Sequence, residues 1–498
     1  MFVVPDLDYH ALAPELVLTG ALVLVLLADL VFEERGRSSS ASLAGIGLLA
    51  ALVPVLTLAI DGDDRSMFGG AYVVDDFALV LKALFLLAGF VTILISSDYI
   101  GEGDYYEGEY YFMLLSSLLG MIVIASSRDL IGLFVAFELL SIPAYLLAGW
   151  RKRDLKGNEA SLKYYLLGVF ATAVMLYGMS LIFGVTGTTL LADIGEVLQG
   201  DLDAAPLVTV GIVFLLVGFA FKVSAVPFHT WAPDTYEGAP TPITAFLSVA
   251  SKAAGFVAML VVVFIGFLGR EDVWSPMFWV LAALTMTVGN LIALRQTNVV
   301  RMLAYSSVAQ AGYMLAPLAV ASDIQDRDGL MGVEVAIGAV VTYLLIYAAM
   351  NLGAFAVVMA VARKTRSGEI RSFGGLFEYA PGLAVLMSVF LFALAGIPPL
   401  AGWLAKLVIF RALLDAGTTS AVVLAVLVGV NSVVGLYYYA SIAREMWMRP
   451  VPDEDRTPIR VPPPIALALG LTAIATVVLG VTEVATRFGD LAVFSVLP

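Results

Sequence analysis

Residues 219–242, FAFKVSAVPFHTWAPDTYEGAPTP, decide the fold because they join an apolar helix, a lysine and a helix breaker. The residues just before them are nearly all apolar, as in a membrane-spanning helix. Pro227 removes the backbone donor that would bond the carbonyl oxygen of Val223, so the helix must kink or break there. Unwound backbone at membrane depth is tolerated only where it is buried in protein or lines a wet cavity. The stretch therefore predicts a broken membrane helix with a buried lysine, Lys222, beside the break.

A second stretch, FALAGIPPLAGWLAKLVIF at residues 392–410, has the same ingredients in the opposite order. Pro398 and Pro399 free the carbonyl oxygens of Leu394 and Ala395, and Lys406 follows the break instead of preceding it. An inverted-topology repeat produces such a reversal. The alternative is that the prolines only bend two long helices.

Apolar runs bounded by charged residues, glycine or proline predict an all-α polytopic membrane protein with about fourteen transmembrane helices. The fourth to eighth helices would form one inverted five-helix repeat and the ninth to thirteenth the other, with the seventh and twelfth helices broken. The predicted spans are 11–32, 41–60, 76–96, 110–126, 130–149, 159–184, 206–228, 240–267, 274–294, 299–320, 333–362, 382–414, 421–447 and 462–485.

The distribution of basic residues predicts the orientation of these helices. Loops after odd-numbered helices carry sixteen lysines and arginines, whereas loops after even-numbered helices and the C-terminus carry five. Because basic loops stay inside, both termini are expected outside. The expected parts of the chain are three N-terminal helices (1–109), the first repeat (110–270), the second repeat (271–450) and a C-terminal helix (451–498).

Composition excludes several kinds of chemistry. The 498 residues are 60% hydrophobic and 14% charged, well below the quarter that is usual for soluble proteins. With no cysteine, the chain can hold no thiolate-bound iron–sulfur cluster, and its two histidines make bis-histidine haem ligation unexpected. Redox chemistry is therefore expected on another chain. The net charge of −14 comes from acidic loops that are typical of solvated surface.

Four ionisable residues near the middle of apolar spans need an explanation: Glu138, Lys222, Lys252 and Lys406. Each such charge costs about 2.5–3.5 kcal/mol on the most lenient scale, so together they indicate a path for protons or ions. Burial favours the neutral form of a lysine, while a nearby carboxylate favours the charged form. Movement of Glu138 relative to Lys222 would thus switch the lysine between holding and releasing its proton. The alternative is that these charges only hold helices together.

Two further residues are candidates with strong competing interpretations. Lys163 is about one turn into its predicted helix, so it could equally snorkel to the interface. His229 follows the break after Lys222 and precedes Lys252, so it could pass a proton between them, or it could be an ordinary hydrogen-bonded histidine.

Four stretches resemble the antiporter-like subunits of respiratory complex I, the proton-pumping NADH–quinone oxidoreductase. They are YYFMLLSSLLGMIVIASSRDLIGLFVAFELLSIPAYLLAG, NEASLKYYLLGVFATAVMLYGMSLIFGVTG, FAFKVSAVPFHTWAPDTYEGAPTPITAFLSVASKAAGF and RMLAYSSVAQAGYM, and the resemblance spans about residues 75–445. It implies fourteen helices, two inverted repeats and proton half-channels that meet at central lysines.

The resemblance also implies roles for the residues above. It makes Glu138 and Lys222 a coupled pair, Lys163 a proton-path lysine, His229 the connecting histidine, Lys252 the central lysine and Lys406 the terminal one. Lysine at position 406 fits the N or L type of subunit, and the end of the chain at 498 without a lateral helix favours the N type. Many relatives carry a histidine where this chain has Gln310, for which water held by Gln310, Tyr305 and Ser306 could substitute.

Cofactors and partners follow from the same resemblance. This chain would bind no cofactor or metal, while FMN, iron–sulfur clusters and quinone would belong to partner subunits of the same enzyme. The chain would assemble with other membrane-arm subunits in the plasma membrane of a bacterium. Two alternatives stay open: a subunit of a multi-chain cation/proton antiporter, and a scaffold subunit that conducts nothing.

Overall fold

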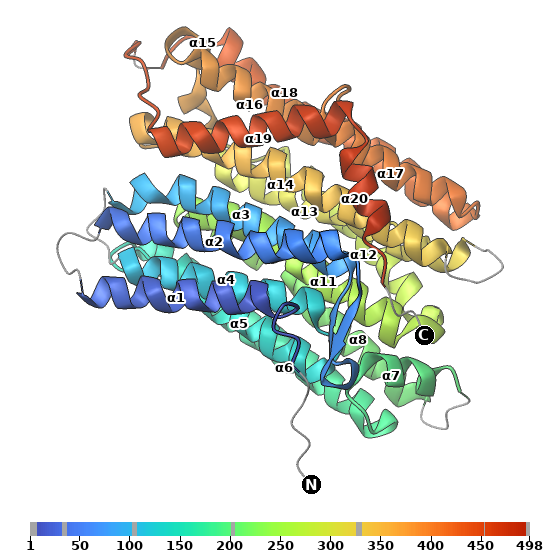
Figure 1. Ribbon diagram of the computed structural model, residues 1–498. Coiled ribbons are helices and arrows are strands. Elements are labelled where there is room, and N and C mark those ends of the chain that lie inside the picture. Colours follow the sequence, from blue (N-terminus) through green and yellow to red (C-terminus); the bar gives the residue numbers. More distant parts are fainter. Residues whose placement is uncertain are drawn as a thin grey trace.

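A computed structural model describes residues 7–31, 37–101, 107–200, 205–324, 331–452 and 454–494. Figure 1 shows long helices that run side by side in one bundle, with a small β-hairpin at one end. Large apolar side chains are exposed along several outer helices, as expected for a surface that faces lipid or other membrane chains.

The N-terminal part consists of three long helices that pack with each other and with α4. They are α1 (Ala13–Val31), α2 (Arg37–Asp61) and α3 (Asp76–Gly101), and α4 is Glu107–Ser126. An antiparallel hairpin, β1 (Arg65–Met67) and β2 (Tyr72–Val74), connects α2 with α3 and pairs Met67 with Tyr72. Gly69 and Gly70 have positive φ in this turn, a conformation that glycine adopts without strain.

The middle of the chain contains the first broken helix. Its elements are α5 (Leu130–Ala148), α6 (Leu155–Thr186), the short α7 (Leu191–Leu198), α8 (Ala205–Lys222) and α9 (Trp231–Gly238). A continuous helical run, Thr241–Gly266, follows, and all residues of its apolar 18-residue stretch are buried. This run comprises α10 (Thr241–Phe246), a π-helical turn (Leu247–Ser251), α11 (Lys252–Val261) and a second π-helical turn (Val262–Gly266).

The last part repeats the pattern of long helices with one break. Its long elements are α12 (Glu271–Ala293), α13 (Val299–Leu315), α14 (Met331–Thr365), α16 (Pro381–Ala395), α17 (Ala401–Asp415), α18 (Thr419–Met448) and α19 (Pro463–Val481). The short helices α15 (Leu376–Tyr379) and α20 (Val484–Leu491) lie before α16 and after α19. In α14, 94% of the residues in its apolar 18-residue stretch are buried. Helices that are apolar and buried on all sides lie in the core, so α14 and the run Thr241–Gly266 form the centre of the bundle.

Polar caps fix where several helices begin. The Asp129 side chain accepts the Gly132 amide at the start of α5, and Asn298 accepts the amides of Val300 and Arg301 at the start of α13. These caps explain why charged or amide residues precede the apolar runs. They also fix the register of α13, which carries polar residues of the candidate site.

The predicted all-α membrane fold is confirmed. A helix overlaps each predicted span, and within the described residues eleven helices are long and apolar enough to cross a membrane. Both predicted breaks are present: α8 ends at Lys222 and α9 begins at Trp231, while α16 ends at Ala395 and α17 begins at Ala401. The exact number of crossings and the inverted repeats stay predictions.

The structure adds features that the apolar pattern did not predict. The hairpin, α7 and α20 were not expected, and the proposed division after residue 109 falls in the first turn of α4. Both described ends of the chain lie on one side of the bundle (Figure 1). Asp8 pairs with Arg65 of the hairpin, and the Phe494 ring packs on the Phe77 ring at the start of α3. An even number of crossings requires this arrangement.

Candidate functional site

Lys222 lies at the end of α8, where the first break begins, and its side chain is enclosed by α5 and α6. The residue is 2% exposed. Its Nζ donates to Ser141 Oγ at 2.9 Å and, more weakly, to the Tyr164 hydroxyl at 3.4 Å. The ammonium also lies 5.3 Å from the centre of the Phe137 ring. The hydrogen-bond acceptors of Lys222 are thus both neutral.

Glu138 lies on α5, one turn before Ser141, and does not form an ion pair with Lys222 within 4.0 Å. It is close enough to Lys222 for Coulombic attraction. Its Oε1 is buried and accepts no hydrogen bond from the described residues. The expected partners are therefore near each other but separated in this conformation, and their coupling stays a prediction.

Lys252 begins α11, directly after the first π-helical turn, and is 1% exposed. Its Nζ donates to the backbone oxygen of Ser307 at 2.6 Å and to Ser307 Oγ at 2.5 Å. A π-helical turn widens the helix locally and is frequent at functional sites. The lysine at the centre of the bundle thus contacts α13 and again meets only neutral oxygens.

Lys406 lies on α17 and binds backbone that the second break sets free. Its Nζ donates to the carbonyl oxygen of Ala395 at 2.7 Å, one of the two acceptors that Pro398 and Pro399 leave without a helical donor. Gly396 has φ +88°, and a Cβ there would come within 2.8 Å of Lys406 Cδ. The lysine at this break therefore fills the place that the glycine leaves open.

Hydrogen bonds, together with two steps between neighbouring residues of the chain, connect Lys252 with Lys406. Ser306, the neighbour of the Lys252 acceptor Ser307, bonds the Tyr439 hydroxyl at 2.5 Å. Gln310 Nε2 donates to the same hydroxyl and to the carbonyl oxygen of Leu394, each at 3.1 Å. The next carbonyl, that of Ala395, accepts Lys406. Gln310 also accepts a hydrogen bond from the Tyr343 hydroxyl.

The region between Lys222 and Lys252 is polar but not continuously bonded. Ser251 lies near Tyr164, and Tyr236 lies near Ser307. The hydroxyls of Ser251 and Tyr236 are nevertheless buried and have no hydrogen-bond partner among the described residues. Buried polar groups of this kind are usually satisfied by water, which is what a water-mediated proton path requires.

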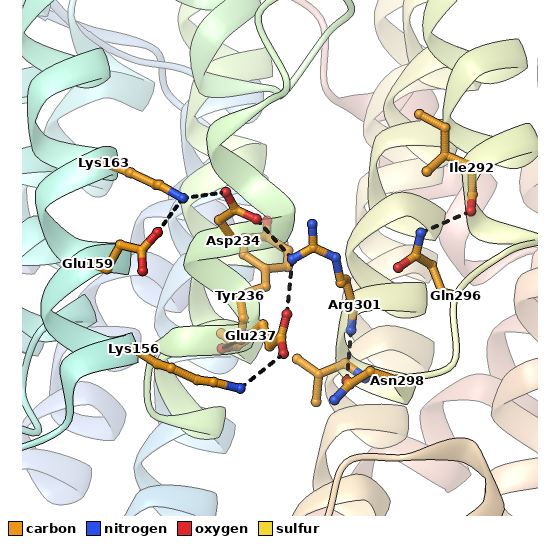
Figure 2. Close-up of polar contacts among 12 residues, drawn as sticks. Lys156, Glu159, Lys163, Asp234, Tyr236, Glu237, Ile292, Gln296, Asn298 and Arg301 are labelled. Carbon is orange, nitrogen blue, oxygen red and sulfur yellow. Dashed lines mark hydrogen bonds and ion pairs between the residues drawn. The ribbon is translucent and has the colours of Figure 1, made fainter.

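Lys163 is not in the same cluster as Lys222. Its side chain is 42% exposed, and its Nζ pairs with Glu159 at 2.6 Å and with Asp234 of α9 at 2.9 Å (Figure 2). Asp234 also binds Arg301, the third residue of α13, at 2.8 Å. Snorkelling to the surface, the competing interpretation of Lys163, agrees with this exposure, and its role in a proton path stays a prediction.

His229 lies in the break between α8 and α9 and is partly buried. Its ring is 6.4 Å from the Tyr305 ring, and its buried Nδ1 has no hydrogen-bond partner among the described residues. No hydrogen bond joins it to Lys222 or Lys252 within the part of the chain that the structure describes. The same part contains no cluster of three His, Cys, Asp or Glu residues that could hold a metal ion.

Two other buried cations have carboxylate partners. Lys82 of α3 is completely buried and pairs with Glu15 of α1 at 2.8 Å, while its Nζ also donates to the Tyr72 hydroxyl at 3.0 Å. Arg128, between α4 and α5, pairs with Asp75 at 2.9 Å. Lys82 therefore differs from the three lysines above, because it has a carboxylate partner within contact distance.

Sequence reasoning found the buried lysines but missed most of their acceptors. Ser141, Tyr164 and Ser307 were not predicted, and neither was the bridging position of Asp234. Ser141 lies three residues after Glu138, on the same helical face, and this spacing was the one available signal. Ser306 and Gln310 were expected to act together, and both contact the Tyr439 hydroxyl.

Comparisons with known proteins identify the family of this chain. Residues 127–432 match the family model described as NADH:quinone oxidoreductase/Mrp antiporter, TM. The chain is 39% identical over 477 residues to NADH-quinone oxidoreductase subunit N of Trichlorobacter lovleyi, covering 95% of this chain and 94% of the relative. The subunit N of Moorella thermoacetica is 40% identical over 476 residues, covering 95% of this chain and 96% of that relative.

Solved structures show the same fold. A chain of respiratory complex I from Thermus thermophilus, solved with bound aureothin, is 32% identical and superposes with a TM-score of 0.76, covering 94% of this chain and 97% of that one. A chain of the Mrp complex from Dietzia sp. DQ12-45-1b has a TM-score of 0.80 at 22% identity, covering 97% and 96%, and supports the fold alone. The chain therefore belongs to the subunit N family of NADH–quinone oxidoreductases.

Proposed function

We propose that this chain is a proton-translocating membrane-arm subunit of an NADH–quinone oxidoreductase. Protons would move along Glu138, Lys222, His229, Lys252 and Lys406, driven by quinone reduction on other subunits. Family membership supports the assignment to this enzyme. One observation on the chain itself carries the transport role: three buried lysines donate only to neutral oxygens.

The three buried lysines have no fixed counter-ion among the described residues. Among the described residues, none of Lys222, Lys252 and Lys406 forms an ion pair within 4.0 Å. A charge at this depth costs about 2.5–3.5 kcal/mol, and no adjacent carboxylate offsets that cost permanently. Hydroxyl and carbonyl oxygens stabilise an ammonium but also tolerate a neutral amine. Each lysine can therefore exist in either protonation state, and movement of Glu138 would shift that balance at Lys222.

The polar contacts indicate which parts of the proton path need bridging water. From Lys252 to Lys406 the protein supplies Ser306, Tyr439 and Gln310 in contact, so few waters are needed. From Lys222 to Lys252 the unpartnered hydroxyls of Ser251 and Tyr236 require bridging water. In this scheme Gln310 takes the place of a histidine by orienting hydroxyls rather than by carrying a proton.

FMN, iron–sulfur clusters and quinone would be bound by partner subunits, and this chain would bind none of them. It would assemble with other membrane-arm subunits in a bacterial plasma membrane, with both termini outside. A multi-chain cation/proton antiporter is the alternative, and copurification of NADH-oxidising subunits with this chain separates the two.

Proton pumping by the assembled complex tests the proposal. Lys252→Met retains most of the side-chain volume and removes the titratable group. In inverted membrane vesicles, we expect NADH-driven proton uptake to fall by at least about tenfold, equivalent to ~1.4 kcal/mol, with copurifying subunits unchanged. Arg411→Gln is the matched control, because Arg411 is largely exposed and pairs weakly with Asp415 at 3.7 Å. Unchanged proton uptake in Lys252→Met would leave only the scaffold interpretation.

A further inference from the structure

The short helix α9 lies between the Lys222 site and the Lys252 site and contacts both. The Trp231 indole nitrogen donates to the carbonyl oxygen of Phe221, next to Lys222, at 3.0 Å. The same indole stacks on the Tyr164 ring with 4.4 Å between ring centres, and Tyr164 is an acceptor of Lys222. Farther along α9, Tyr236 lies near Ser307, the acceptor of Lys252. A shift of α9 would therefore disturb the surroundings of both lysines.

Asp234 connects α9 with the helices on either side of it (Figure 2). One carboxylate oxygen, Oδ2, accepts Lys163 of α6 at 2.9 Å, and the other, Oδ1, accepts Arg301 of α13 at 2.8 Å. Glu237, one turn later, binds the same guanidinium at 2.9 Å and lies 3.7 Å from Lys156 of α6. We call Lys163, Asp234, Glu237 and Arg301 the α9 clamp.

The α6 and α13 residues of this clamp are close in sequence to the acceptors of the buried lysines. Lys163 directly precedes Tyr164, which accepts Lys222. Arg301 is six residues before Ser307, less than two helical turns along α13. Because helices are rigid over such distances, an ion pair at the clamp fixes the acceptors beside the two lysines.

The ion pairs of the clamp contribute little to the free energy of unfolding. The paired side chains are between 28% and 42% exposed, and exposed ion pairs contribute about 0–1 kcal/mol each. A set that joins three helices through one carboxylate has a different consequence, since it restricts their relative positions. Proton transfer through bridging water depends steeply on such positions.

We propose that Asp234 is a positioning residue for proton transfer between Lys222 and Lys252. By holding α6 and α13 against α9, it keeps the hydroxyls of Tyr164 and Tyr236 in line between the two lysines. This inference rests on the proposed function. It gives the break between α8 and α9 a specific task, which is to place a short, separately held helix inside the proton path.

The test uses the assembled complex in inverted vesicles and compares three variants. Asp234→Asn keeps the size of the side chain and removes its charge, so we expect NADH-driven proton uptake to fall by about tenfold. Asp234→Glu restores the charge and should recover most of the rate. Glu378→Gln is the matched control: it removes the exposed Arg456–Glu378 pair (2.6 Å), which joins α15 to the loop after α18, and should pump normally.

Further variants separate positioning from a loss of folding. Lys163→Gln and Arg301→Gln each release one side of the clamp, and combining either with Asp234→Asn should add little to the loss. Should Asp234→Asn fail to assemble, these two variants carry the test by themselves. If all assembled clamp variants pump normally while Lys252→Met does not pump, the positioning role of Asp234 is overturned and the proposed function stands. Normal pumping in Lys252→Met as well would overturn the proposed function and the inference with it.

Discussion

Lys82 and Lys252 are both completely enclosed lysines on membrane helices, one among the N-terminal helices and the other at the centre of the bundle. Lys82 pairs with Glu15 at 2.8 Å and donates to the Tyr72 hydroxyl. Lys252 donates to the hydroxyl and carbonyl oxygens of one serine, Ser307. The two sites are equally buried, but only one supplies a permanent opposite charge.

This difference shows what burial alone does not decide. A carboxylate within contact distance favours the charged lysine and opposes its loss of a proton. Breaking such a buried pair is costly, because the remaining charge has no partner. Where all the hydrogen-bond acceptors are neutral, no contacting carboxylate holds the lysine in its charged form. The N-terminal ion pair is thus suited to hold α1 against α3, and the central lysines are suited to exchange protons.

The largest expected effect is the loss of pumping in Lys222→Met. The variant retains the volume that packs against Phe137 and removes the titratable amine at the end of α8. We expect proton uptake driven by NADH to fall by at least about tenfold, while the amount of assembled complex stays unchanged. The comparison between the two kinds of lysine breaks down if this variant pumps as well as the wild type.

The opposite pattern is expected for Lys82→Met. Removal of the cation leaves the Glu15 carboxylate buried without its partner, which typically costs about 3–5 kcal/mol. The measurable result is a lower thermal stability and less assembled complex, with near-normal pumping per assembled complex. Glu15→Gln combined with Lys82→Met should recover part of the stability, since no charge is then left unpaired. A strong loss of pumping in a stable, fully assembled Lys82→Met complex would place Lys82 in the proton path.

A smaller effect tests whether Glu138 acts through Lys222. The two residues attract each other without forming an ion pair, as expected if their separation changes during the cycle. Glu138→Gln and Lys222→Met should each impair pumping, and the double mutant should be scarcely worse. A coupling energy of about 1 kcal/mol or more in the double-mutant cycle supports one switching unit. Strictly additive losses would instead mean that the two charges act independently.

Labelling fixes the orientation of the two regions and should have little effect on activity. The chain has no native cysteine, so Arg153→Cys, in the loop between α5 and α6, provides a single thiol on this subunit. We expect a membrane-impermeant maleimide to label position 153 only from the inside and Arg487→Cys, in α20, only from the outside. Because the hairpin beside Lys82 lies on the side of both termini, the Lys82–Glu15 pair would then be nearer the outer face. Labelling of position 153 from outside would reverse this assignment.

The sequence predicted those features that depend on one segment alone, such as whether that segment is apolar enough to span a membrane. Apolar runs located the long helices, and Pro227 and Pro398 located the breaks, because each signal acts within one helix. The lysines stood out because an isolated charge in an apolar run is rare. Their acceptors did not, because serine and tyrosine are ordinary in membrane helices, and only tertiary register brings Ser307 to Lys252. The contact of Lys163 with Asp234 was not predicted for the same reason, because the two residues are 71 positions apart in the sequence.

The most direct test of the central claim is proton pumping by Lys222→Arg. Arginine keeps a positive charge of similar reach beside Ser141 and Tyr164 but cannot release its proton in the working pH range. If the buried lysine must exchange a proton, the assembled Lys222→Arg complex pumps severalfold more slowly than the wild type in inverted vesicles. Pumping at the wild-type rate would show that a fixed positive charge suffices, and it would contradict the account.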